Sequence, residues 1–127
     1  MKQIKLLIIF IATISLLVSC TEKINIKVHI KESSPFLLTI NKDFLHKKQL
    51  QVNSEKYKKI IEWFHNNVYG WRSAPSVSYS PTILIEQSDF RLLILNDGVI
   101  IGFNDDVGIP RLYSKSVNIR TFDFLKQ

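Results

Sequence analysis

The stretch Thr82–Phe103 constrains the fold of this 127-residue chain most strongly. Two short polar segments, Ser88-Asp89 and Asn96-Asp97-Gly98, divide it into three apolar runs: Thr82–Gln87, Phe90–Leu95 and Val99–Phe103. Asp-Gly between two apolar runs is a strong short-range signal for a β-hairpin. The stretch therefore predicts a three-stranded antiparallel meander. Because its runs are nearly continuous, we expect these strands to be central in the sheet or covered on both faces.

One strong helix is predicted before the meander, over residues 54–69. Apolar side chains recur there at the spacing of a single helix face: Tyr57, Ile60, Ile61, Phe64 and Val68. Asn53 or Ser54 is placed to cap the N-terminus. Gly70 is placed to end the helix in the left-handed conformation. The apolar stripe must cover a sheet.

Further strands are predicted on both sides of these elements. Ile24, Ile26, Val28 and Ile30 alternate with polar residues, which predicts a half-buried strand. After a turn at Ser33-Ser34-Pro35, Phe36–Ile40 is expected to return antiparallel, and Phe44–Val52 forms a weaker strand. Arg111–Lys115 is a candidate edge strand, and Thr121–Leu125 a closing helical turn.

These elements predict the α+β fold class. We expect an antiparallel sheet of about five to seven strands, covered on one face by one main helix. Residues 20–127 show no repeat and no internal boundary, so they are expected to form a single domain.

The first twenty residues have a different character. Lys2 and Lys5 precede the uncharged apolar run Leu6–Val18, which is shorter than the roughly 20 residues of a membrane-spanning helix. Leu17-Val18-Ser19-Cys20 closes the run. This segment resembles the signal peptides of bacterial lipoproteins, whose lipobox has a Leu three positions before an obligatory Cys. The alternative is an ordinary signal peptide, or an uncleaved anchor helix, followed by a stray Cys.

The resemblance implies that residues 1–19 are removed and that Cys20 becomes the lipidated N-terminus. Its sulfur would carry diacylglycerol, and its new amino group would be acylated. Two or more acyl chains hold a protein stably on a membrane. In the proteobacterial members of this class, an Asp after the Cys retains the protein in the inner membrane. Thr21 stands there instead, which favours the periplasmic face of the outer membrane.

The charge of the chain is unevenly distributed. The formal net charge is +6, with an excess of lysines in residues 22–59 and an excess of acids in residues 86–106. This pattern indicates a dipolar surface rather than a nucleic-acid-binding face. On the predicted first strand, Lys23, Lys27 and Lys31 could meet anionic lipid headgroups. The favoured interpretation is that they keep an edge strand soluble.

No set of residues predicts catalysis or metal binding. His29, His46 and His65 are far apart and lack ligand spacing. Lipidation would consume Cys20, the only thiol. Asn104–Gly108 contains two carboxylates but lacks the spacing of a calcium loop, so a polar turn is expected. We therefore expect no catalytic residue, no metal, no cofactor and no small-molecule substrate.

An aromatic cluster remains as the candidate site. Trp, Tyr and Arg are enriched in binding hot spots, and five such residues surround the predicted helix end and the irregular stretch 71–81: Trp63, Tyr69, Trp71, Arg72 and Tyr79. They are predicted to bind a protein partner. In the alternative, both tryptophans are lids that pack the helix onto the sheet.

Together these features favour a small non-enzymatic envelope lipoprotein that acts by binding a protein, as an accessory or assembly subunit of an envelope complex. The alternative is a periplasmic inhibitor or immunity lipoprotein that neutralises a toxin or hydrolase. An enzyme is the third and weakest hypothesis.

Overall fold

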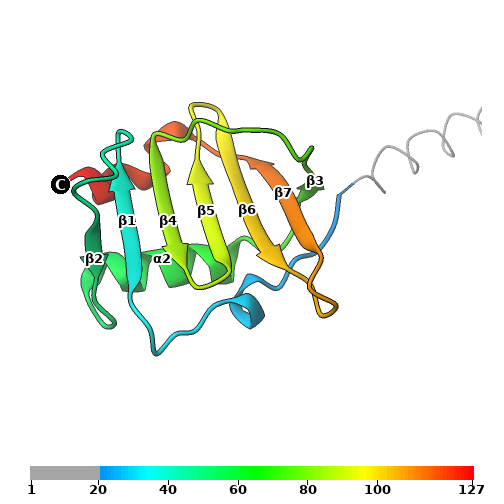
Figure 1. Ribbon diagram of the computed structural model, residues 1–127, viewed down its shortest axis with the longest axis horizontal. Helices are drawn as coiled ribbons and strands as arrows, with labels where there is room; N and C mark the ends of the chain where they lie inside the picture. Colours follow the sequence, from blue (N-terminus) through cyan, green and yellow to red (C-terminus); the bar gives the residue numbers. More distant parts are fainter. Residues whose placement is uncertain (1–20) are drawn as a thin grey trace, which may run out of the picture.

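The computed structural model describes residues 21–127, and the predicted signal peptide and Cys20 lie outside this range. Seven strands form one sheet in the order β2-β1-β4-β5-β6-β7-β3, and every neighbouring pair is antiparallel. One α-helix lies against the sheet (Figure 1). The elements in chain order are η1 (Ile26–His29), β1 (Phe36–Ile40), β2 (Lys48–Leu50), α2 (Glu55–Asn66), β3 (Arg72–Ser73), β4 (Ile83–Gln87), β5 (Phe90–Ile94), β6 (Gly98–Asn104), β7 (Pro110–Ser116) and η2 (Ile119–Lys126). The predicted α+β class is confirmed.

The predicted meander forms the centre of the sheet. β4 pairs with β5, β5 with β6, and β6 with β7, each antiparallel. The Asn96-Asp97 turn is closed by the Leu95 amide, which donates to the Gly98 carbonyl at 2.9 Å. Leu92 and Ile94 of β5 face α2 and Leu93 faces the other way, and all three are buried, so burial on both faces explains the almost continuous apolar sequence of this strand.

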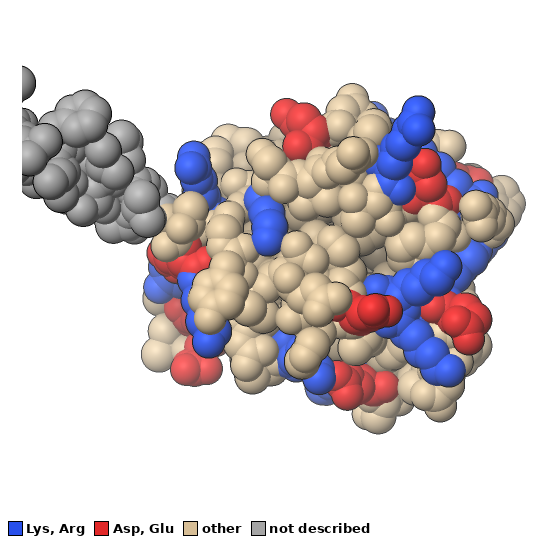
Figure 2. Space-filling model, turned by 180° about the vertical axis from the view of Figure 1, so that it is seen from behind, with Lys and Arg blue, Asp and Glu red and all other residues tan. Residues whose placement is uncertain are grey.

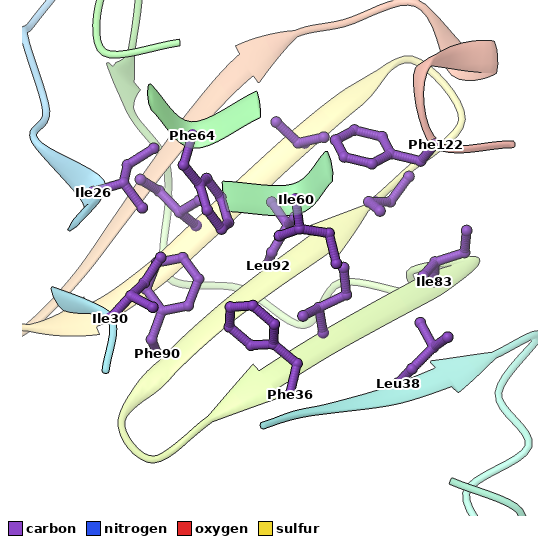
Figure 3. Packing of buried hydrophobic residues seen from close by; sticks show 14 of the residues in the cluster. Ile26, Ile30, Phe36, Leu38, Ile60, Phe64, Ile83, Phe90, Leu92 and Phe122 are labelled. Carbon is purple, nitrogen blue, oxygen red and sulfur yellow. The ribbon is translucent and has the colours of Figure 1, made fainter. Parts of the chain in front are cut away.

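The core lies between the sheet and α2. Ile60 and Phe64 of α2 are fully buried, and they pack over Leu92 and Phe90 of β5 (Figure 3). The Phe64 and Phe90 rings meet edge to face, with centroids 5.4 Å apart. Burying one such side chain contributes about 1.5–3 kcal/mol. The one apolar stripe of α2 therefore holds the helix on the sheet.

The helix starts as predicted and ends earlier than predicted. The Tyr57 amide donates to Ser54 Oγ at 3.2 Å, so Ser54 is the N-cap. The last helical residue is Asn66, because Asn67 leaves helical geometry and its side-chain amide donates to the Trp63 carbonyl at 2.7 Å. Gly70 does have a positive φ of 83°, but it lies in the turn before β3. The prediction that Gly70 ends the helix is wrong.

The prediction of a strand over Ile24–Ile30 is also wrong. This segment contains the short 3₁₀ helix η1. Ile24, Ile26 and Ile30 are buried as the alternation suggested, but Val28 is 70% exposed. The segment packs beside α2, and the Ile24 amide donates to the Val68 carbonyl, outside the strand ladder. These apolar residues are therefore buried in the core although their segment is not a strand of the sheet.

Two smaller corrections concern the sheet edges. The predicted strand Phe44–Val52 shortens to β2, because only Lys48–Leu50 pair with β1. β7 is not the edge strand, since the two-residue strand β3 pairs outside it.

Candidate functional site

The sheet face opposite α2 has no helix on it among the described residues. Leu93 and Ile100 point to this face, yet they are only 7% and 3% exposed. The connection between β3 and β4, residues 74–82, must cross β7, β6 and β5 to join an edge strand to a central one. The connection begins beside β7, where the Ala74 amide donates to the Leu112 carbonyl at 2.9 Å.

A surface hollow of about 530 Å³ lies on the open part of this face. Arg91, Gly102 and Leu112 contribute to it from three adjacent strands, and Ser76 from the crossing connection. A Cβ at Gly102 would lie 2.9 Å from Leu112 Cδ2 and 3.4 Å from an Arg91 guanidinium nitrogen, so a side chain there would displace these two side chains and change the shape of the hollow. The Arg91 guanidinium therefore lies across the glycine, inside the hollow. We call this site the Arg91 hollow.

Arg91 has no ion-pair partner among residues 21–127, although acids lie nearby. Its cross-strand neighbour Glu86 pairs instead with Lys47, with 3.4 Å between Nζ and Oε2. Arg111, on the other side, is paired with Asp105 at 3.0 Å. A guanidinium presents a planar set of donors that matches a carboxylate. The Arg91 hollow can thus bind an acidic side chain or a chain terminus.

Asp105 is fully engaged by its own loop. Its carboxylate accepts hydrogen bonds from the amides of Ile109 at 2.8 Å and Val107 at 3.1 Å, and from Arg111 Nε. These hydrogen bonds, and above all the one from the Ile109 amide, hold the pKa of Asp105 below its usual value. The segment Asn104–Gly108 is the polar turn expected from the sequence.

The five predicted partner-binding residues do not form one surface. Trp71 is completely buried, and its Nε1 donates to the Asn67 carbonyl at 2.7 Å. Trp63 is half-buried, with edge contacts to the rings of Trp71 and Phe122 at 6.1 and 5.1 Å. The expectation that Trp71 contacts a partner must be corrected, because a fully buried indole has no surface to offer. Trp71 is part of the hydrophobic core and Trp63 packs against that core, so both tryptophans have the packing role of the alternative interpretation.

The other three residues lie in two separate places. Tyr79 is half-buried in the crossing connection, where its hydroxyl donates to the Pro75 carbonyl at 2.6 Å. Tyr69 is 65% exposed and Arg72 is exposed, at the edge of the sheet that β3 forms. Arg91 could not be identified as a site residue from the sequence, because only the strand register places it opposite Gly102 in the hollow.

The histidines stand apart from one another. His29 stacks on Phe103 with ring centroids 3.7 Å apart, and burial lowers its pKa from the usual value. His46 Nδ1 lies 3.0 Å from the carboxylate of Asp43. In the described part of the chain, no three His, Cys, Asp or Glu side chains are grouped as a metal site.

Seen from the side of α2, basic and acidic side chains are interspersed (Figure 2). None of the helices within residues 21–127 has both the length and the apolar character needed to cross a bilayer. Comparison with protein-family models, curated proteins and solved structures found no match for this chain.

Proposed function

We propose that this protein is a small non-enzymatic lipoprotein of the bacterial envelope, and that it binds a protein partner as an accessory or assembly subunit of an envelope complex. Lipidated Cys20 anchors it, at the periplasmic face of the outer membrane. The observation that supports partner binding best is the Arg91 hollow: an exposed guanidinium that lacks an ion-pair partner within residues 21–127, set in a concave part of the helix-free face.

The surroundings of Arg91 fit a protein ligand. Arginine is enriched among the few residues that dominate binding energy. The hollow is rimmed by hydroxyl and amide side chains, among them Ser76, Ser88 and Asn104, which can donate to or accept from a partner's backbone. Glu22, Glu86 and Asp89 also line the hollow, so a partner would pair an acidic side chain with Arg91 and offer basic or donor groups to these acids.

Site-specific photo-crosslinking in native membranes tests this proposal. A photoreactive amino acid replaces Ser76 or Asn104 at the rim, and Lys58 on α2 serves as the control position. All three residues are exposed, so the probe should not disturb the core. We expect both rim positions to crosslink to the same protein and the helix position not to do so.

Charge reversal gives the second part of the test. Arg91→Glu should abolish the rim adduct, whereas Lys58→Glu should leave it unchanged. Adducts that survive Arg91→Glu, or that form equally from all three positions, would contradict a partner site in the hollow. A crosslinked toxin or hydrolase that loses activity on binding would identify the inhibitor alternative.

A further inference from the structure

The loop between β1 and β2, residues 41–47, exposes two large apolar side chains. Phe44 is 57% exposed and Leu45 is 91% exposed. They are the two central residues of a turn, because the His46 amide donates to the Asp43 carbonyl at 3.2 Å. Glycine, proline and small polar residues dominate such turn positions. Turn formation therefore does not account for a phenylalanine and a leucine here.

The loop is held in one shape by contacts of its own. Asn41 and Lys42 have positive φ angles of 52° and 61°, and the Asp43 amide donates to the Ile40 carbonyl at 3.1 Å, which forms a first turn. The carboxylate of Asp43 lies 3.0 Å from Nδ1 of His46 and closes the second turn through side chains. A preorganised loop loses little conformational entropy when it binds. The two apolar side chains are thus exposed in a fixed position before any contact is made.

Lysines flank the two apolar side chains on both faces of the sheet. Lys48 lies opposite Leu38, a core residue, and therefore on the α2 side. Lys47 lies on the other face, where its Nζ is 3.4 Å from Glu86 and 6.0 Å from the centre of the Phe44 ring. Cations on opposite faces do not converge on one small anion. A wide anionic surface that meets the end of the loop attracts both.

The β1–β2 loop lies at the same end of the sheet as Glu22. Strand register joins one residue from each of five strands in a row across the sheet: Ile40, Ile83, Ile94, Val99 and Lys115. Trp71 continues this row, because it precedes Arg72, which pairs with Ser114. Glu22 forms a bridge to Trp71. The loop follows Ile40 directly, so one end of the sheet carries both the loop and Glu22 (Figure 1).

We propose that Phe44 and Leu45 insert into the surface of the anionic membrane to which Cys20 is attached. This inference rests on the proposed lipidation of Cys20. An extended chain spans at most about 3.6 Å per residue, so Cys20 stays within about 7 Å of Glu22. Its acyl chains then hold this end of the sheet at the bilayer. The loop supplies a second attachment about 24 Å away, across five strand spacings of about 4.8 Å.

The size and charge of the loop fit a membrane better than a protein. A specific protein interface buries about 800 Å² on each partner, which two side chains cannot supply. A second membrane attachment needs little apolar area, because the acyl chains already hold the protein. Residues 41–48 carry three lysines and one acid: Lys42, Lys47, Lys48 and Asp43. Two further acids at this end stand apart from the loop, Asp97 in the β5–β6 turn beyond β4 and Glu22 at the Arg91 hollow.

The β6–β7 hairpin provides a matched comparison. Its tip lies at the opposite end of the sheet, after Asn104, and Val107 there is 78% exposed. Two acids, Asp105 and Asp106, precede this valine. The two tips thus share apolar exposure but differ in charge and in their end of the sheet.

Insertion is tested on the lipidated full-length protein in vesicles. Lipidation blocks the thiol of Cys20, the only cysteine, so one introduced cysteine can be labelled selectively. Leu45→Cys and Val107→Cys each carry an apolar, polarity-sensitive fluorophore in place of an exposed aliphatic side chain. Lipids with a spin label high on the acyl chain quench a probe that enters the bilayer. We expect a blue shift and strong quenching at position 45 and neither at position 107. Equal signals at both positions would overturn the insertion.

The contribution of the apolar side chains is tested in the Leu45→Cys protein. Phe44→Ser should lower the ratio of inserted to free probe at least about tenfold, which is the effect of one buried apolar side chain. Val28→Ser, at an exposed valine of η1, is the matched control and should leave the ratio unchanged.

The contribution of charge is tested in the same protein. Vesicles containing phosphatidylglycerol should quench more than vesicles of phosphatidylcholine alone. Each basic side chain near an anionic surface contributes about a fivefold effect, so Lys42→Gln/Lys48→Gln should lower the inserted-to-free ratio about 25-fold in phosphatidylglycerol. The matched variant Lys58→Gln/Lys59→Gln on α2 should retain the parent ratio.

Two further outcomes would overturn the membrane contact. One is unchanged insertion in Phe44→Ser and in Lys42→Gln/Lys48→Gln when both retain the circular dichroism of the parent. The other is a photoreactive residue at position 45 that crosslinks to a protein in native membranes and not to lipid. Mass spectrometry of Cys20 separates this inference from the proposed function. Unmodified Cys20 would overturn both, whereas modified Cys20 with equal signals at positions 45 and 107 would overturn the insertion alone.

Discussion

Gln87 ties the turn before β1 to the sheet, and its replacement by leucine tests how this turn is held. The side chain is 6% exposed. Its Oε1 accepts from the Lys31 amide at 2.6 Å, and its Nε2 donates to the carbonyls of Lys31 at 2.7 Å and Ser34 at 2.9 Å. Tyr57 of α2 also donates to the Ser34 carbonyl, at 2.8 Å. One turn is thus bound by both the sheet and the helix.

The expected cost follows from these bonds. A typical hydrogen bond contributes about 1 kcal/mol net, and a buried group left without a partner costs about 1–3 kcal/mol. Gln87→Leu removes three bonds, so we expect a loss of about 2–4 kcal/mol in the free energy of unfolding. Tyr57→Phe should lose only about 1 kcal/mol, because Gln87 still donates to Ser34. The double variant should lose about 0.5–1 kcal/mol more than the sum of the two single losses, since the Ser34 carbonyl then has neither the Gln87 nor the Tyr57 donor.

Urea unfolding of the purified protein in detergent measures these losses. Tryptophan fluorescence reports on the core, because Trp63 and Trp71 both pack within it. Gln49→Leu on the exposed strand β2 is the control and should change stability by no more than about 0.5 kcal/mol. A loss below about 1 kcal/mol for Gln87→Leu, at an unchanged denaturant slope, would refute the role given to this network.

Three further predictions follow from single positions. Thr39 is 2% exposed, and its Oγ1 has no hydrogen-bond partner among residues 21–127. Thr39→Val should therefore stabilise the protein by about 1 kcal/mol in thermal unfolding, and a destabilised variant would contradict this reasoning. A Cβ at Gly98 would lie 2.6 Å from the Lys115 carbonyl oxygen, so Gly98→Ala should cost about 1–3 kcal/mol in urea unfolding, whereas Ser116→Ala on the same ladder should be nearly neutral. Burial lowers the pKa of His29 below 6.5, against a smaller opposing effect of Asp106, so the unfolded chain binds the proton more readily. The contribution of neutral His29 to stability should therefore be fully present above pH 6.5 and be lost as the pH drops towards the pKa of the folded state. Urea unfolding at several pH values measures this dependence. His29→Gln should remove it, whereas His65→Gln, at an exposed site, should retain it.

Features with local causes could be predicted before the structure. The Asp-Gly turn and the apolar runs beside it predicted the central meander, because the residues that form a hairpin are close in sequence. Ser54 could be identified as one of two possible caps because the capping bond reaches only three residues ahead. The lipid anchor at Cys20 remains a prediction from the resemblance.

Features that depend on distant partners could not be predicted. The alternation over Ile24–Ile30 identified three buried side chains but not their environment, since an apolar face can pack beside a helix as well as in a sheet. Aromatic composition marked Trp71 and Tyr69 alike, although one is fully buried and the other largely exposed. β3 has only two residues, too few to show any periodicity.

The sequence by itself determined the α+β class, the meander, the one amphipathic helix within residues 21–127 and the two residues that could cap it, because periodicity, turn chemistry and capping act over a few residues. Only the tertiary structure decided where the functional candidates lie. Arg91 meets Gly102 through strand register, and Glu22 meets Trp71 across the whole of η1, β1, β2 and α2. Such contacts depend on how separate segments pack together, and no pattern within one segment records them.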